Sequence, residues 1–256
     1  MKVVLWGLHE AGYRALRYLF AQGHEVFVIT DNAPSHIPSV IELARSLDLP
    51  LLVAPSADEM AAAVSTFQPD LGISMYYAEI IPNDLIRIPK LGGYNFHPSL
   101  LPKHRGCFSA PWAIIDGDAL TGVSCHKMLE AVDRGPILCQ RAVPIVADET
   151  AYSLYHKLID SAIDLLEEAL VKAPKASSFL RAQSGEGSYH KRAVPSGGLI
   201  DPAWDDERID RFIRALYFPP HPPARMRIVE RLYDVETFTD YQAFVSGEGI
   251  AKNRPQ

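Results

Sequence analysis

The fold is decided at the start of the chain, where residues 2–20 read KVVLWGLHEAGYRALRYLF. The apolar run Lys2–Trp6 is typical of a buried strand, and Tyr13–Phe20 carries apolar residues at helical spacing. Between them, Gly7–Gly12 is predicted to form a turn. The β-branched run Glu25–Thr30 follows as a second strand. A strand, a helix and a further strand in this order indicate a parallel sheet.

The same alternation continues along the first half of the chain. Further strands are expected at Leu51–Val53, Asp70–Ser74 and Gly93–Phe96, and helices at Ser39–Leu47 and Asp58–Phe67. Asp58 is expected close to the N-cap of its helix. We therefore predict an α/β fold with a Rossmann-like, mostly parallel sheet flanked by helices.

A smaller region is expected after the sheet. We predict a larger domain over residues 1–185 and a small C-terminal extension over residues 186–256. The larger domain is expected to contain a helix at Ser109–Asp116, extended segments at Thr121–Met128 and Pro136–Ile145, and an amphipathic helix at Thr150–Lys172. The extension is expected to contain the helix Asp205–Leu216, a stiff extended piece at Phe218–Pro223, a hairpin at Arg225–Val235 and a frayed tail from about Gly247.

Composition narrows the class of protein. Of the 256 residues, 48% are hydrophobic and 22% are charged, which are values of a globular chain. The net charge of −6 argues against a general nucleic-acid binder, which needs a broad basic surface. The apolar run at the amino end is too short for a secretory signal or a membrane span. The three cysteines, Cys107, Cys125 and Cys139, are too few and too far apart for a disulfide framework or a CxxC metal site, so we expect buried thiols in a reducing compartment, the cytoplasm.

The loop after the first strand carries glycines but neither common nucleotide-binding signature. Position 9 is histidine where G-x-G-x-x-G needs glycine, and Gly12 is not followed by the lysine of a P-loop. A nicotinamide-dependent dehydrogenase is therefore disfavoured. The loop is either a tight turn or a helix start whose N–H groups hold a substrate phosphate, and in the second case His9 is a candidate substrate-binding residue.

The most informative stretch is residues 95–106, which read NFHPSLLPKHRG. Asn95 and His97 lie two apart at the end of an expected strand, so both side chains point to one face. A hydrogen-bonded pair at a strand end would explain them equally well. Asp133 lies in a loop between two extended segments. It is either a structural turn residue or a carboxylate that orients the His97 ring.

This stretch, together with the pattern M-x4-D-x-G-x-I at residues 128–137, resembles the folate-dependent formyltransferase family. Members include methionyl-tRNA formyltransferase, glycinamide ribonucleotide formyltransferase and the nucleotide-sugar N-formyltransferases. The resemblance also covers residues 71–82 and extends into the C-terminal third. It implies that Asn95, His97 and Asp133 are the catalytic residues.

The resemblance further implies transfer of a formyl group from N10-formyltetrahydrofolate to an amine, without a metal. Asn95 would bind the oxyanion, and Asp133 would orient His97 and relay a proton toward the departing folate nitrogen. His97 would act either as the general base or, when protonated, as a second oxyanion partner. Main-chain groups on two loops would bind the folate, and the implied cofactor-binding residues are Met75, Tyr77, Ile80, Leu129, Val132 and Asp133. Met75 and Tyr77 are alternatively the apolar end of a strand.

The amine substrate of a nucleotide-sugar enzyme also carries a pyrophosphate and a base. Lys103 and Arg105 are candidates for binding the phosphates, because the arginine fork suits phosphate geometry. Tyr217 and Phe218 are candidates for stacking on the base or sugar. A role for these two aromatics in the core or in a dimer contact is an equal alternative.

The C-terminal third indicates which member the chain resembles. Too few residues follow Arg214 for the basic β-barrel of the tRNA-acting enzymes, and the purine-pathway enzyme lacks an extension of this kind. Residues 196–224 are most similar to enzymes that formylate GDP-perosamine, a GDP-linked 4-amino-4,6-dideoxymannose of O-antigen biosynthesis. Enzymes acting on dTDP-linked 4-amino sugars are the alternative, and a non-catalytic nucleotide or folate sensor is disfavoured by the complete triad. We expect a cytoplasmic homodimer that binds a nucleotide-linked amino sugar and neither nucleic acid nor a membrane.

Overall fold

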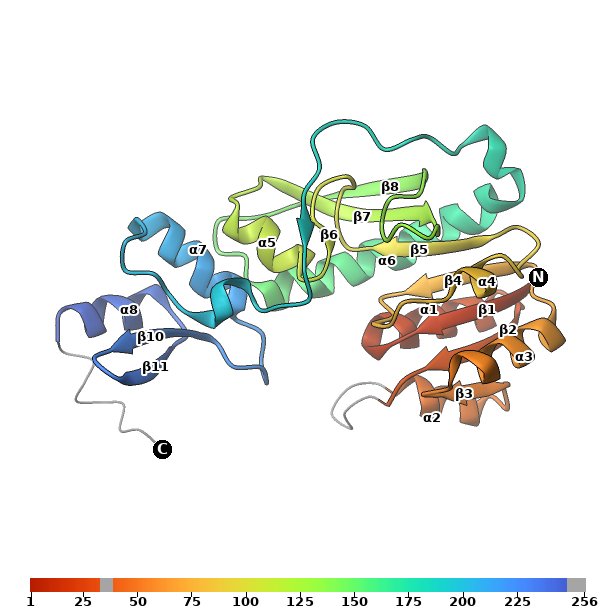
Figure 1. The fold of residues 1–256 in the computed structure, drawn as a ribbon, viewed down its shortest axis with the longest axis horizontal. Helices are drawn as coiled ribbons and strands as arrows, with labels where there is room; N and C mark the ends of the chain where they lie inside the picture. Colours follow the sequence, from red (N-terminus) through yellow and green to blue (C-terminus); the bar gives the residue numbers. More distant parts are fainter. Residues whose placement is uncertain (33–38, 248–256) are drawn as a thin grey trace. The chain divides into compact units, whose positions relative to one another are not determined.

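The computed structural model describes residues 1–32 and 39–247 (Figure 1). The described chain divides into two compact units. The first unit comprises Met1–Arg105, Gly122–Ala142 and Leu158–Ser188. The second comprises Gly106–Thr121, Val143–Lys157 and the described residues from Tyr189 onward. The boundary expected after residue 185 stays a prediction. The tail expected from about Gly247 lies almost entirely outside the described residues.

A seven-stranded sheet has the order β3-β2-β1-β4-β5-β7-β8. Its strands are β1 (Lys2–Gly7), β2 (Glu25–Thr30), β3 (Leu51–Val53), β4 (Leu71–Met75), β5 (Gly93–His97), β7 (Leu120–Lys127) and β8 (Ile137–Pro144). Strands β1 to β5 pair in parallel, whereas β5 and β7 are antiparallel. This confirms the predicted mostly parallel sheet. The interior strand β1 is apolar from Val3 to Trp6, and these side chains are fully buried, as expected for a sheet covered on both faces.

The helices of the first half are α1 (His9–Ala21), α2 (Val40–Ser46), α3 (Ala57–Phe67) and α4 (Asn83–Ile86). The predicted turn Gly7–Gly12 was wrong, because α1 already begins at His9. A Cβ atom on Gly12 would lie 2.6 Å from the carbonyl carbon of Gly7, so glycine is needed where the helix starts close over the strand end. The N-cap of α3 is Ser56 rather than Asp58, and it forms a capping box with Glu59.

The remaining elements follow the order predicted from sequence, with additions. They are β6 (Arg105–Gly106), α5 (Ser109–Ile115), α6 (Ala151–Lys172), the 3₁₀ turns η1 (Ala173–Ser178) and η2 (Pro195–Gly198), β9 (Tyr189–His190), α7 (Asp206–Leu216), β10 (Ala224–Ile228), β11 (Arg231–Val235) and α8 (Phe238–Val245). The antiparallel pair β10 and β11 confirms the predicted hairpin. Helix α8 was not predicted.

The segment Phe218–Pro223 is a turn, so the prediction of a stiff extended piece was wrong. The His221 N–H donates to the carbonyl of Phe218 at 2.9 Å, and the Pro219–Pro220 bond is cis. Proline restricts φ but does not prevent the non-proline residue His221 from closing a turn with its N–H, so the proline content alone does not predict an extended segment.

Within residues 1–32 and 39–247, no helix has both the length and the apolar composition needed to span a bilayer.

Candidate active site

The carboxyl end of β5 brings Asn95 and His97 to the site. The two residues alternate with the fully buried Phe96, so both side chains leave the strand on the opposite face from Phe96. Strand β7 pairs with β5 in a register that sets Asn95 opposite His126. The site therefore forms where an apolar strand of the sheet ends in polar residues.

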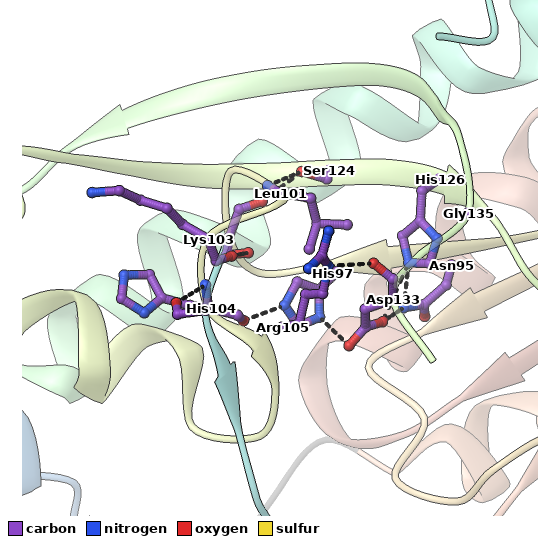
Figure 2. A network of polar contacts seen from close by, with 12 residues as sticks. Asn95, His97, Leu101, Lys103, His104, Arg105, Ser124, His126, Asp133 and Gly135 are labelled. Atoms are coloured by element: carbon purple, nitrogen blue, oxygen red, sulfur yellow. Dashed lines mark hydrogen bonds and ion pairs between the residues drawn. The ribbon is translucent and has the colours of Figure 1, made fainter. Parts of the chain in front are cut away.

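Asp133 reaches the same place from the loop between β7 and β8 (Figure 2). Its backbone has a φ of 54°, and its side chain is only 7% exposed. One carboxylate oxygen, Oδ2, lies 3.5 Å from Nδ1 of His97. The other, Oδ1, accepts a hydrogen bond of 3.4 Å from Nδ2 of Asn95. The side chains of Asn95 and His97 thus both contact the Asp133 carboxylate, so the three residues that the sequence singled out lie together.

His97 is buried and has both ring nitrogens directed at acceptors. Nε2 lies 2.7 Å from the carbonyl oxygen of His104 and donates to it. In the neutral ring the lone pair is then on Nδ1, which faces Asp133. Burial lowers the pKa of His97 below its ordinary value, while the Asp133 charge and the His104 carbonyl act in the opposite direction. The arrangement suits a group that is neutral at rest and accepts a proton at Nδ1, beside a carboxylate that stabilises the resulting cation.

His126 belongs to the same cluster, although the sequence analysis did not single it out. Its side chain is 2% exposed, and Nε2 lies 3.2 Å from Nδ2 of Asn95 and 3.3 Å from Oδ1 of Asp133. The only signal in the sequence was a histidine within the predicted extended segment Thr121–Met128. Its proximity to Asn95 depends on the pairing of β5 with β7, which the spacing of residues does not reveal.

A second polar group holds the main chain of the Asp133 loop. Gln183 donates from Nε2 to the carbonyl oxygens of Asp133 at 2.7 Å and Gly135 at 2.9 Å. Its Oε1 accepts from Arg105, at 3.1 Å from Nε and 2.6 Å from a terminal nitrogen. Arg105 Nε also lies 3.2 Å from the Asp133 carbonyl oxygen. We call Arg105 and Gln183 the loop clamp. Gln183 carried no sequence signal, because it lies in a connection rich in Pro, Ser, Gly and Ala.

The segment after His97 is held by buried hydrogen bonds. Ser124 Oγ accepts from the Leu101 N–H at 3.0 Å and from Gln140 Nε2 at 2.7 Å, and it donates to the Ser99 carbonyl at 2.6 Å. Such a satisfied network keeps the segment rigid. Lys103, in the same segment, has an exposed side chain, whereas Arg105 is half-buried and engaged in the loop clamp. Their predicted contacts with phosphates stay predictions.

The predicted cofactor-binding residues fall into buried and exposed sets. Met75 is fully buried and Tyr77 is half-buried. Burial, with Asp31 and Glu79 nearby, raises the pKa of Tyr77. The side chains of Ile80, Leu129 and Val132 are 78%, 48% and 42% exposed. Exposed apolar side chains on two loops are suitable walls for a flat ring such as a pterin.

The remaining predicted residues lie at the start of α1 and in the second unit. His9 is the first residue of α1 and has a φ of 53°. Within the second unit, Tyr217 and Phe218 line a pocket of about 220 Å³. Its other lining residues are Pro219, Pro220, His221, Pro223 and Glu236. The Phe218 ring is packed edge-on against Tyr155, with centroids 5.2 Å apart.

Comparison with known proteins identifies the class. Residues 16–170 match the family model described as formyl transferase. A GDP-perosamine N-formyltransferase from Brucella melitensis is 42% identical over 194 residues, which cover 76% of this chain and 74% of the relative. This chain therefore belongs to the formyl transferase family and is an enzyme of that class.

Solved structures show the same fold. An N-formyltransferase from Helicobacter canadensis, in complex with folinic acid and dTDP-3-aminofucose, matches with a TM-score of 0.70 and 19% identity, covering 92% of this chain and 86% of that chain. A 4-N formyltransferase from Francisella tularensis matches with a TM-score of 0.71 and 18% identity, covering 92% and 97% of the two chains.

Proposed function

We propose that this enzyme transfers the formyl group of N10-formyltetrahydrofolate to the 4-amino group of a nucleotide-linked 4-amino-4,6-dideoxysugar, and that this sugar nucleotide is GDP-perosamine. The observation that carries the proposal is the convergence of Asn95 and His97 on Asp133, at 3.4 and 3.5 Å. The relative from Brucella melitensis, whose name gives GDP-perosamine as its substrate, supports the choice of sugar.

Each of the three side chains has a step that its position allows. Asn95 donates from Nδ2 to the formyl oxygen, which gains negative charge as the sugar amine attacks the formyl carbon; one such donor is typically worth ~10²–10³ in rate. His97 accepts the amine proton at Nδ1, a role worth ~10²–10⁴. Asp133 stabilises the protonated ring. The bond from the formyl carbon to the sugar nitrogen forms, the bond to N10 breaks, and His97 returns the proton to N10.

The choice of GDP over dTDP follows the relative whose name gives GDP-perosamine. Tyr217 and Phe218 remain the proposed residues for stacking on the base or sugar, because both provide aromatic surface in a pocket lining. A dTDP-linked amino sugar is the second candidate, favoured by the complex of the Helicobacter canadensis structure.

We further propose that the enzyme is a cytoplasmic homodimer that serves O-antigen biosynthesis. Free thiols at all three cysteines are consistent with a reducing compartment. Two exposed apolar side chains near the turn of the β10–β11 hairpin, Val229 at 89% and Leu232 at 42% exposure, are suited to a contact between copies.

Mass spectrometry of the product tests the activity. The enzyme, formyltetrahydrofolate and GDP-perosamine should yield a sugar nucleotide heavier by one formyl group. His97→Ala and Asp133→Asn should each lower kcat at least about a hundredfold, while the matched control His24→Ala, at a half-buried site in contact with the N-terminus, should not. Binding of both ligands without a mass gain would instead support a sensor.

The choice of base is tested separately. Steady-state kinetics with GDP-perosamine and with a dTDP-linked 4-amino sugar should give the higher kcat/KM for GDP-perosamine. If the dTDP-linked sugar has the higher kcat/KM, the proposal of GDP-perosamine as the substrate is wrong.

A further inference from the structure

Three polar atoms form a nearly equilateral triangle beside the catalytic carboxylate. Nδ2 of Asn95 lies 3.2 Å from Nε2 of His126 and 3.4 Å from Oδ1 of Asp133, and the last two atoms are 3.3 Å apart. Figure 2 shows the His126 ring and the Asn95 amide on the same side of the Asp133 carboxylate. The amide of Asn95 is therefore shared between two acceptor groups.

The orientation of the His126 ring is set by its other nitrogen. Nδ1 lies 3.1 Å from the carbonyl oxygen of Lys127 and donates to it. The neutral ring then carries its lone pair on Nε2, directed at the Asn95 amide. Because His126 is 2% exposed and lies opposite Asn95 in the β5–β7 pair, water does not easily replace it as the acceptor.

The Asn95 amide nitrogen has two acceptors at different distances. Nε2 of His126 lies 3.2 Å away, and Oδ1 of Asp133 lies 3.4 Å away, which is long for an N–H···O bond. The contact with Asp133 is therefore the weaker one, and it is the hydrogen bond that an incoming formyl oxygen can replace. If His126 could not accept, the amide could rotate by about 180° and present its own oxygen to the formyl oxygen, and two acceptors would face each other.

We propose that His126 is a positioning residue of the reaction. By accepting one amide hydrogen, it holds the NH₂ group of Asn95 toward the site and leaves the second hydrogen for the formyl oxygen. This inference rests on the proposed function, because it assigns a transferable N–H to Asn95. It adds a fourth residue to the triad, one that acts on the reaction through Asn95.

Two substitutions of His126 distinguish a role in positioning Asn95 from a purely structural role. His126→Phe keeps a ring but removes the acceptor, whereas His126→Gln places an amide oxygen at about the reach of Nε2. We expect His126→Phe to lower kcat about 10- to 100-fold, short of the full loss of an oxyanion donor, with KM for both substrates within about threefold. His126→Gln should recover most of kcat. His24→Phe, the matched control, should leave kcat unchanged.

A spectroscopic measurement reports on the amide without catalysis. The ¹⁵N-bound side-chain protons of Asn95, assigned by their loss in Asn95→Ala, should exchange slowly with solvent in the unmodified protein and in His126→Gln, and rapidly in His126→Phe. If His126→Phe does not fold, the comparison is made between His126→Gln and His126→Asn instead. The asparagine side chain is shorter, so only His126→Gln should preserve kcat.

The outcomes distinguish the two proposals. If the unmodified protein forms no formylated sugar, the proposed function fails, and amide exchange alone decides whether His126 orients Asn95. If the unmodified protein is active, a His126→Phe enzyme with kcat within about threefold of it overturns the positioning role. Equal loss of kcat in the Phe and Gln variants, with a similar fall in Tm, would also overturn it in favour of a structural role.

Discussion

Replacement of Gln183 by methionine tests whether the loop clamp holds Asp133 in place. Methionine is close to glutamine in size and shape but removes the four hydrogen bonds that Gln183 makes with Arg105, Asp133 and Gly135. A neutral hydrogen bond contributes about 0.5–1.5 kcal/mol net and one to a charged group about 1.5–3 kcal/mol, so two bonds of each kind set an upper limit of about 9 kcal/mol. Gln183 is half-buried, and water can replace part of the loss. We therefore expect the free energy of unfolding to fall by about 1–3 kcal/mol.

The same change should affect turnover. Without the clamp, the Asp133 loop samples other conformations, and a bias of about 1.4 kcal/mol away from the productive one lowers kcat about tenfold. Gln183→Glu gives an independent test, because the carboxylate keeps the Arg105 contact but cannot donate to the carbonyls of Asp133 and Gly135. It should be destabilised at neutral pH and partly recover when protonated at low pH.

Urea unfolding and steady-state kinetics on the full chain measure both effects. The control is Gln22→Met, at an exposed position at the end of α1, which should change neither quantity. The reasoning is refuted if Gln183→Met unfolds within about 0.5 kcal/mol of the unmodified protein, the range of ordinary surface substitutions, and has an unchanged kcat.

Three further predictions follow from single contacts. Gly12→Ala should lower the free energy of unfolding by about 1–3 kcal/mol in urea titrations, because its Cβ would lie 2.6 Å from the Gly7 carbonyl carbon. Burial raises the pKa of Tyr94 to about 12, so the folded state retains that proton and stability should fall between pH 10 and about 12; Tyr94→Phe should reduce this fall in pH-dependent unfolding experiments. Asp133→Asn should lower the pKa of His97 further, because burial then acts without the opposing charge, and NMR titration of the ring protons measures it.

Local sequence patterns were sufficient for most of the architecture. Apolar runs of five or six residues alternate with segments of helical spacing, and such periodicities reflect which face of each element is buried. The positions of Asn95 and His97 on one face follow from the period of a strand, which is a property of adjacent residues alone. These features required no knowledge of which strands pair.

Other features depended on close contacts between residues only a few positions apart. Helix α1 begins at His9 with Gly12 packed closely against Gly7, and the turn at Phe218 is closed by the hydrogen bond from the His221 N–H. Propensity and periodicity do not contain this information, because each residue involved is compatible with more than one local conformation.

The sequence by itself determined the α/β class and the types of side chain available for chemistry. Only the tertiary structure decided which of these side chains meet. Asn95 is 31 residues from His126 and 38 from Asp133, and Gln183 is 50 residues from Asp133. Strand pairing and a returning connection bring these groups within about 3 Å of one another, and hydrogen bonds and proton transfer act only at that range.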